Sequence, residues 1–396
     1  MFFLEKQTRI ERYFDIKMIA VKMKFSRYFF VVPFLFVALL CAAGCISSDD
    51  ESAKGTMPSS THLKGSPVAT SGNIMVDITE MDVIMPGIYY QFPQQEMTFI
   101  DFTLTNNGNE DAAVMVESEI SGYTEKAVNT VNVPARQSVT IGQTPLFRQG
   151  LIPSERTNAQ IHYVIKSDGK VILEQTDPVT IYAKDTMVWA VNEGDESTDM
   201  SGFIGAWVTP HATGIDKLIR TAANYHSDRA ITGYQCVDSC RNEEQWVDYT
   251  NEQVKAIYYA LQKDYKITYI NTPISFGKSS DSTQKVRLPA DSLSSASANC
   301  IDGTVLYASV LEAIEINPHI IVTPEHAFVC YDTSDNQYST EVCLETTMTG
   351  SAPFEDAVSQ GNAEYAEEET NGNFKSGNSQ DLSVSDLRSK GILPFN

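Results

Sequence analysis

The sequence predicts a two-domain protein in which an all-β sandwich is followed by an α+β domain. Two observations predict this order: apolar residues alternate with polar ones over 74–187, and helical periodicity begins after residue 202. The chain of 396 residues is long enough for two domains with tails. Its net charge of −22 excludes nucleic acid as a partner, because phosphates would be repelled.

The pattern of residues 1–45 predicts a signal peptide or lipid anchor. The segment MKFSRYFFVVPFLFVALLCAAGC carries Lys24 and Arg27 and then a short apolar run interrupted by Pro33. Its ending resembles a prokaryotic lipobox, so Cys45 is the expected site of lipidation. An uncleaved anchor is the alternative. In either case we expect attachment to the cell membrane, with the folded domains outside the cytoplasm.

Residues 46–73 are polar and rich in Ser, Gly and Pro, so they predict a flexible tether. Within 74–187, Ile100, Phe102 and Leu104 share one face of a strand, and IKSDGKV predicts a hairpin. Several short strands at this spacing predict an immunoglobulin-like sandwich, similar to adhesion modules of microbial surfaces. It shows no catalytic constellation, and its role as spacer or binding module stays open.

Residues 202–355 predict the α+β domain. NEQVKAIYYALQKDY has the period of an amphipathic helix, whereas HAFVCYD and STEVCLETT have the composition of strands. VNEGDESTDMSG, residues 191–202, predicts a linker before this domain. Residues 356–396 form an acidic C-terminal extension, expected to be loop or partly disordered before one last short helix.

Cys300 stands where a loop of small residues gives way to the apolar stretch IDGTVLYASVL. Apolar residues point in nearly all directions there, which predicts a buried central helix. Unpaired N–H groups and the helix dipole at its first turn favour a thiolate over a thiol. Position alone fits an inert core thiol equally well.

A cysteine nucleophile needs a histidine to take its proton and an acid to orient that histidine. His326 opens one predicted strand and Glu345 lies on the next. If Tyr331 pairs with Thr340, Glu345 stands directly opposite His326, with Cβ atoms ~5 Å apart.

Other candidates fit less well. Asp332 lies about 20 Å along the strand from His326. We expect Asp302 to complement the helix dipole. His319 has no facing acid that the pattern reveals.

The remaining cysteines leave alternatives open. Cys236 and Cys240 are close enough for a local disulfide, or they could be two zinc ligands, although a second ligand pair is absent. Cys330 and Cys343 lie on the two predicted strands, diagonal to one another, and we expect them to pack rather than to form a bridge.

Residues 202–355, most clearly 284–350, resemble the transglutaminase-like superfamily of papain-like cysteine enzymes. The shared pattern is a cysteine that opens a helix, then HAF on a strand, then an acid before Thr in LETT. The resemblance implies that Cys300 is the nucleophile, His326 the base and Glu345 the acid, where Asp is usual. The family also uses a Gln or Trp side chain at the oxyanion, and Gln284 is our candidate.

The sequence therefore predicts a surface-anchored cysteine enzyme, a peptidase, amidase or acyltransferase. It would act on a protein or peptide substrate through an acyl-thioester, without a metal or other cofactor. Whether water or an amine accepts the acyl group stays open. One alternative is a non-catalytic binding or adhesion protein with a vestigial triad. Another is a zinc hydrolase that uses Cys236, Cys240 and a histidine.

Overall fold

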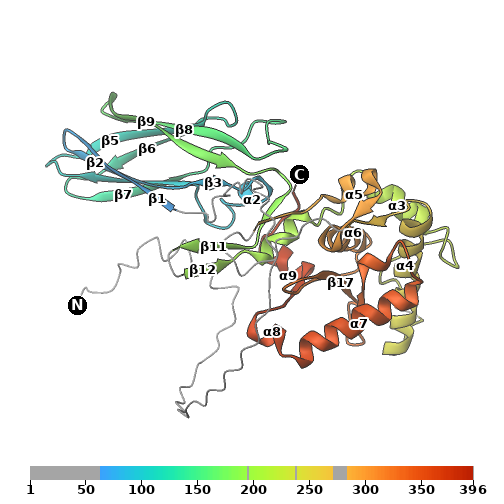
Figure 1. The fold of residues 1–396 in the computed structure, drawn as a ribbon. Helices are drawn as coiled ribbons and strands as arrows, with labels where there is room; N and C mark the ends of the chain where they lie inside the picture. Colours follow the sequence, from blue (N-terminus) through green and yellow to red (C-terminus); the bar gives the residue numbers. More distant parts are fainter. Residues whose placement is uncertain (1–62, 194–195, 237–238, 271–282, 396) are drawn as a thin grey trace, which may run out of the picture. The chain divides into compact units, whose positions relative to one another are not determined.

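The computed structural model describes four stretches of the chain (Figure 1): residues 63–193, 196–236, 239–270 and 283–395. Contacts divide the chain into two units at Pro58 and Ser59, and every described residue belongs to the second unit. The predicted signal or anchor segment, with Cys45, lies outside the described residues. Within those residues, no helix combines the length and the apolar character needed to cross a membrane.

Two sheets make up the N-terminal region, with strand orders β1-β2-β4-β7 and β3-β9-β8-β5-β6. Neighbouring strands are antiparallel except β3 and β9, which are parallel. The strands are β1 Leu63–Ser71, β2 Ile74–Met81, β3 Val83–Ile84, β4 Ile100–Asn106, β5 Ala112–Ile120, β6 Ala127–Val133, β7 Ser138–Gln143, β8 Thr157–Ser167 and β9 Lys170–Ile181. A short helix, α2 Pro86–Tyr89, follows β3.

The apolar side chains of this region meet between the two sheets. Burial alternates along β4 as predicted, and Ile100, Phe102 and Leu104 are fully buried. The Phe102 ring meets that of Tyr163 in β8 edge to face, with centroids 5.7 Å apart. The two sheets thus share one core, and the immunoglobulin-like class of this sandwich stays a prediction.

Two local predictions for this region have opposite outcomes. The hairpin at Asp168-Gly169 is confirmed, because Ser167 pairs with Lys170 and the turn residues have φ of 49° and 78°. The tether prediction is wrong for residues 63–71, which form β1 and pair with β2. An edge strand is held by main-chain bonds along one side, so a polar composition does not exclude it.

The expected linker over residues 191–202 is also more regular than predicted. Strands β11 (Ala190–Glu193) and β12 (Glu196–Asp199) pair as an antiparallel hairpin, and the 3-10 helix η2 (Ser201–Trp207) follows. Strand β10 (Thr186–Val188) pairs with β14 (Thr283–Lys285). Pairing thus replaces the irregular backbone that the polar composition suggested.

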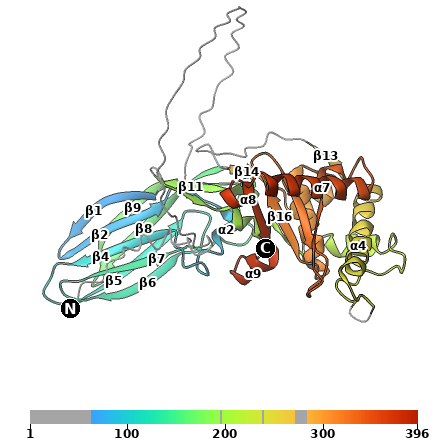
Figure 2. The same ribbon diagram turned by 90° about the horizontal axis from the view of Figure 1, so that it is seen from below.

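A four-stranded antiparallel sheet, ordered β18-β17-β16-β19, forms the centre of the C-terminal region (Figures 1 and 2). Helix α6 packs against β16 and β17, while α7 packs against β17 and β18. The strands are β13 Thr268–Tyr269, β15 Ser297–Ala298, β16 Pro318–Val322, β17 Ala327–Asp332, β18 Glu341–Leu344 and β19 Gln380–Ser383. The helices are α3 Ile215–Ala222, α4 Glu243–Lys263, α5 Pro289–Ser295, α6 Cys300–Ala313, η3 Thr346–Met348, α7 Phe354–Thr370, α8 Asn373–Ser376 and α9 Val384–Ser389.

The prediction of a buried central helix is confirmed. Every residue of α6 from Cys300 to Leu311 is buried. The hydroxyl of Thr304 donates to the Cys300 carbonyl at 2.8 Å, so this polar group costs little inside the core. A helix buried on all sides gives its first residue a fixed position.

The prediction of loop or partial disorder within residues 356–396 is wrong, because they belong to the same fold, whereas the expected last short helix is confirmed as α9. Helix α7 begins at Phe354 and runs past the expected boundary at 355, and β19 pairs with β16. Buried Ala357 and Leu387 anchor this segment. The acidic residues that suggested disorder lie mainly on the exposed face of α7, where charge is compatible with a stable helix.

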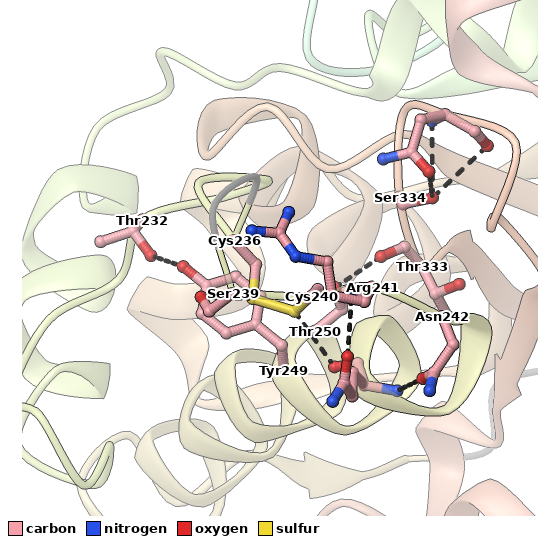
Figure 3. Close-up of a disulfide and its surroundings, with 12 residues drawn as sticks. Thr232, Cys236, Ser239, Cys240, Arg241, Asn242, Tyr249, Thr250, Thr333 and Ser334 are labelled. Atoms are coloured by element: carbon pink, nitrogen blue, oxygen red, sulfur yellow. Dashed lines mark hydrogen bonds between the residues drawn. A yellow bond between two sulfur atoms is a disulfide. The ribbon is translucent and has the colours of Figure 1, made fainter.

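A disulfide joins Cys236 to Cys240 just before α4 (Figure 3). Asn242 then caps that helix through its side chain. Within α4, the Thr250 hydroxyl donates to the Thr333 carbonyl at 2.7 Å and ties the helix to the loop after β17. The local bridge is confirmed, and the zinc interpretation is wrong because both sulfurs are covalently paired.

Candidate active site

Cys300 is the first residue of α6 and is 1% exposed. The Asn299 side chain accepts from the Asp302 N–H at 2.8 Å, and the Asp302 carboxylate accepts from the Asn299 N–H at 3.3 Å. This capping box fixes the point where the helix begins. Asp302 therefore serves the first turn as predicted. Within the described residues Cys300 is the free cysteine.

His326 immediately precedes β17, and its ring contacts the two other predicted residues. Its Nε2 lies 2.6 Å from Oε2 of Glu345. The Cys300 side chain lies close enough to the same ring to raise its pKa. Because Nε2 is engaged by Glu345, Nδ1 is the nitrogen left for the sulfur. The structure thus brings Cys300, His326 and Glu345 together.

Glu345 is 3% exposed and both of its carboxylate oxygens are engaged. Oε2 contacts His326, whereas Oε1 accepts from the main-chain N–H of Thr347 at 2.8 Å and from the Thr347 hydroxyl. Glu345 also caps η3 through this contact. The carboxylate is thereby aimed at the imidazole and cannot rotate freely.

The surroundings of His326 favour its protonated form. Burial lowers the pKa of the ring, but hydrogen bonds and charge from Cys300 and Glu345 raise it, to about 10 in balance. Burial raises the pKa of Glu345, yet His326 and Thr347 bring it below its ordinary value. A protonated imidazole beside the sulfur is the arrangement that stabilises a thiolate.

The predicted strand register is wrong by two residues. Tyr331 pairs with Val342 rather than Thr340, and β18 ends at Leu344. Glu345 consequently lies beyond the strand end and reaches His326 diagonally. The loop between β17 and β18 is longer than expected, which accounts for the shift. At its start the Thr333 N–H donates to the Thr340 carbonyl at 2.9 Å. The triad forms because a glutamate spans the extra distance.

The prediction that Cys330 and Cys343 merely pack is also wrong. In the observed register they stand directly opposite one another, with Cα atoms 3.9 Å apart, and form a disulfide. This bridge links the strand that follows His326 to the strand that precedes Glu345. It fixes the hairpin that holds the two side chains.

Glu364, on α7, is a neighbour of the site that the sequence reasoning missed. Its Oε2 lies 3.6 Å from Nε2 of His326. Gln360, one helical turn earlier, donates to its other oxygen at 2.8 Å. The Gln360–Glu364 spacing was the available signal, but it lay in a segment interpreted as a loose acidic tail.

Gln284, the oxyanion candidate, is buried in β14 rather than exposed in a loop. Trp189 donates to its Oε1 at 3.1 Å, and its Nε2 has no hydrogen-bond partner among the described residues. No hydrogen bond within the described part of the chain joins Gln284 to Cys300 or His326.

A pocket lies next to the first turn of α6. Asn299, Tyr269 and Thr347 contribute to its lining, together with residues of α4 and η3. Tyr269 is 41% exposed, so one wall of the pocket faces solvent. The nearby charges of Cys300 and Glu345 add to burial in raising the pKa of Tyr269.

His319 is surrounded by acids, contrary to prediction. Its Nδ1 lies 2.7 Å from Asp381 and 3.5 Å from Glu341, and its Nε2 lies 3.5 Å from Asp332. Burial lowers the pKa of the ring, but Asp332 and Asp381 raise it, to about 10 in balance. Burial raises the pKa of Glu341 to about 7. No thiol contacts this ring within the described residues.

Three clusters of the described residues each bring their donor atoms within 4.8 Å of one another: His319 with Glu341 and Asp381, His326 with Glu345 and Glu364, and Cys330 with Glu341 and Cys343, whose sulfurs form a disulfide. We assign no ion to any of them. At His326 the 2.6 Å contact with Glu345 has the length of a hydrogen bond.

Comparisons with known proteins give no family. No family model matches the chain. A triosephosphate isomerase from Synechococcus sp. (strain CC9311) is 21% identical over 160 residues, which are 38% of this chain and 66% of that protein, just under two thirds. A solved beta-glucuronidase from glycoside hydrolase family 2 superposes with a TM-score of 0.19 and 10% identity, over 51% of this chain and 22% of that chain. Neither similarity carries an argument about fold or activity.

Proposed function

We propose that the protein is a surface-anchored cysteine enzyme that cleaves or transfers amide or peptide acyl groups. One observation supports this most strongly: a helix-opening cysteine lies close enough to a histidine to raise its pKa, and Nε2 of that histidine lies 2.6 Å from a buried carboxylate. Each partner has the chemistry that a thiol nucleophile needs. The transglutaminase-like resemblance of residues 202–355 is part of the same proposal.

The reaction follows from these contacts. The Cys300 thiolate attacks the amide carbonyl, and the protonated His326 ring gives its proton to the departing nitrogen as the C–N bond breaks. The product is an acyl-thioester on Cys300. His326 then removes a proton from water or from an amine, which displaces the sulfur and restores the thiolate. Glu345 holds the ring in position throughout.

Backbone groups at the start of α6 would stabilise the oxyanion. The first N–H groups of a helix have no partner inside it, and that of Cys300 lies beside the reacting sulfur. Gln284 stays a candidate second donor, since its amide nitrogen is buried and has no acceptor among the described residues. Attachment to the cell membrane through residues 1–45 is also part of the proposal, and places a protein or peptide substrate outside the cytoplasm.

A binding or adhesion protein with a vestigial triad is the competing proposal. One observation favours it, namely that Cys300 is only 1% exposed. Turnover of any amide or peptide library member that is lost in Glu345→Ala would count against this alternative.

The direct test is covalent labelling of the full chain by an electrophilic thiol probe such as iodoacetamide. Cys300 should be labelled at neutral pH faster than a free cysteine, with the adduct mapped by mass spectrometry. Cys300→Ala should abolish that adduct. Equal labelling of the variant and the wild type would disprove the nucleophile.

A further inference from the structure

We propose that Glu364 is a positioning residue of the Cys300–His326 pair: a second carboxylate, delivered by α7, that favours the protonated His326 ring and so keeps the thiolate–imidazolium pair intact to higher pH. The proposal rests on the proposed function, since it assumes that Cys300 is the nucleophile.

Two carboxylates converge on one ring nitrogen. Glu345 lies 2.6 Å from Nε2 of His326, and Glu364 lies 3.6 Å from the same atom. One N–H forms its best hydrogen bond to one oxygen, so Glu345 takes the bond and Glu364 acts through its charge. The Gln360 amide donates to Glu364 at 2.8 Å and orients the carboxylate.

The docking of α7 explains why Glu364 is held there. The Cys343 N–H donates to the Asn362 side chain at 2.9 Å, and the Glu345 N–H donates to the Ala357 carbonyl at 3.0 Å. Gly361 allows this approach, because a Cβ there would lie 2.7 Å from the backbone of Leu344. Helix α7 thus covers the free edge of β18. The contacts that place Glu345 also place Glu364.

The surrounding charges allow Glu364 to change state. Burial raises the pKa of Glu364, and the charge of Glu345 adds to that increase, partly offset by Gln360 and His326. Two further titratable groups lie nearby: Cys300 acts on His326, and Tyr269 is affected by the charges of Cys300 and Glu345. The ion pair of Lys255 on α4 engages α7 at Glu355 instead. No Lys or Arg of the described residues pairs with Glu364.

The experiment measures the rate at which iodoacetate, an anion attracted by the imidazolium, alkylates Cys300 in the full chain from about pH 4 to 11. Glu364→Gln should move the fall of this rate at high pH down by about one pH unit, since one negative charge near the imidazolium is lost. Glu364→Asp keeps the charge and should restore part of the shift. Glu367→Gln removes a charge from an exposed position of the same helix and should leave the profile unchanged.

A second readout is independent of thiol reactivity. An NMR titration of the His326 ring, with Cys300 replaced by Ala, should show a lower midpoint in Glu364→Gln than in the matching control. Folded Glu364→Gln with an unchanged midpoint and an unchanged profile would overturn the role of Glu364 and leave the proposed function intact. A shifted midpoint with no alkylation of wild-type Cys300 would overturn the proposed function and keep Glu364 as an electrostatic partner of His326.

Discussion

His326 and His319 lie on the same face of one antiparallel strand pair, yet their surroundings differ in one decisive respect. His319 pairs with Cys330, and His326 lies four residues before Cys330 at the start of the same strand, so strand alternation places both histidines on one face. Each ring contacts acids, and each has a pKa raised to about 10. Within the described residues, only the His326 ring has a thiol, that of Cys300, among the groups that raise its pKa.

The comparison teaches that a raised pKa alone does not identify an active site. Around His319 the acids balance a buried imidazolium, which is a structural role. Around His326 the same charge lies between a carboxylate and the sulfur that opens α6. The proposed function therefore rests on the thiol of Cys300 beside the His326 ring, and not on the raised pKa of that ring.

The largest expected difference is in reactivity. His326→Ala should slow alkylation of Cys300 by about 10²-fold or more, because the proton acceptor is lost. His319→Ala should leave the rate within about twofold. Measured rates at neutral pH test this, with circular dichroism as the check on folding. Equal losses in both variants would show that the two histidines cannot be distinguished in this way.

The next largest expected effect is on the pH dependence of the free energy of unfolding, to which His319 contributes. The folded-state pKa of His319, about 10, exceeds its ordinary 6.5, so its contribution is complete below pH 6.5 and is lost as pH rises toward 10. Burial raises the pKa of Glu341 from 4.5 to about 7. The contribution of Glu341 to the stability of the fold is therefore also lost as the pH rises between those two values. His319→Gln should remove on the order of 3 kcal/mol at neutral pH. Urea unfolding at several pH values measures this. If the free energy of unfolding depended on pH in the same way in the wild type and in His319→Gln, the prediction would be contradicted.

Removing the two disulfides should have the smallest effects on the reactivity of Cys300, and it compares the hairpin of His326 with the segment before α4. Replacing Cys330 and Cys343 by Ala should lower the free energy of unfolding by about 3 kcal/mol, and replacing Cys236 and Cys240 by about 2. Their sequence separations of 13 and 4 set that order. Only the first pair should also slow alkylation of Cys300, severalfold, because it fixes the His326 hairpin. Denaturant titrations and alkylation rates measure both effects, and an equal slowing by the second pair would refute the link.

Much of the site could be predicted because it is encoded locally. The apolar pattern of α6 and the loop of small residues before it indicated where the helix begins, and the composition of the strands identified His326 and Glu345. The register could not be predicted, because the length of the loop after Asp332 decides it. Glu364 depends on how α7 docks, which no local pattern reports.

The other failures have the same cause. Asp381 meets His319 across 62 residues of sequence, on a strand that the acidic composition concealed. Strand β1 is held by main-chain bonds, which leave no apolar signature. Sequence patterns report burial and turns, whereas these contacts follow from which segments pair.

The distribution of bridges also bears on how the chain matures. Five cysteines lie in the described residues, so oxidation offers five choices of the unpaired sulfur, each with three pairings of the other four. Both observed bridges close short loops, which form at the lowest entropic cost. Cys300 has no neighbour of that kind and becomes buried once α6 packs. Correct oxidation thus requires little guidance beyond local closure, and it leaves the Cys300 sulfur reduced.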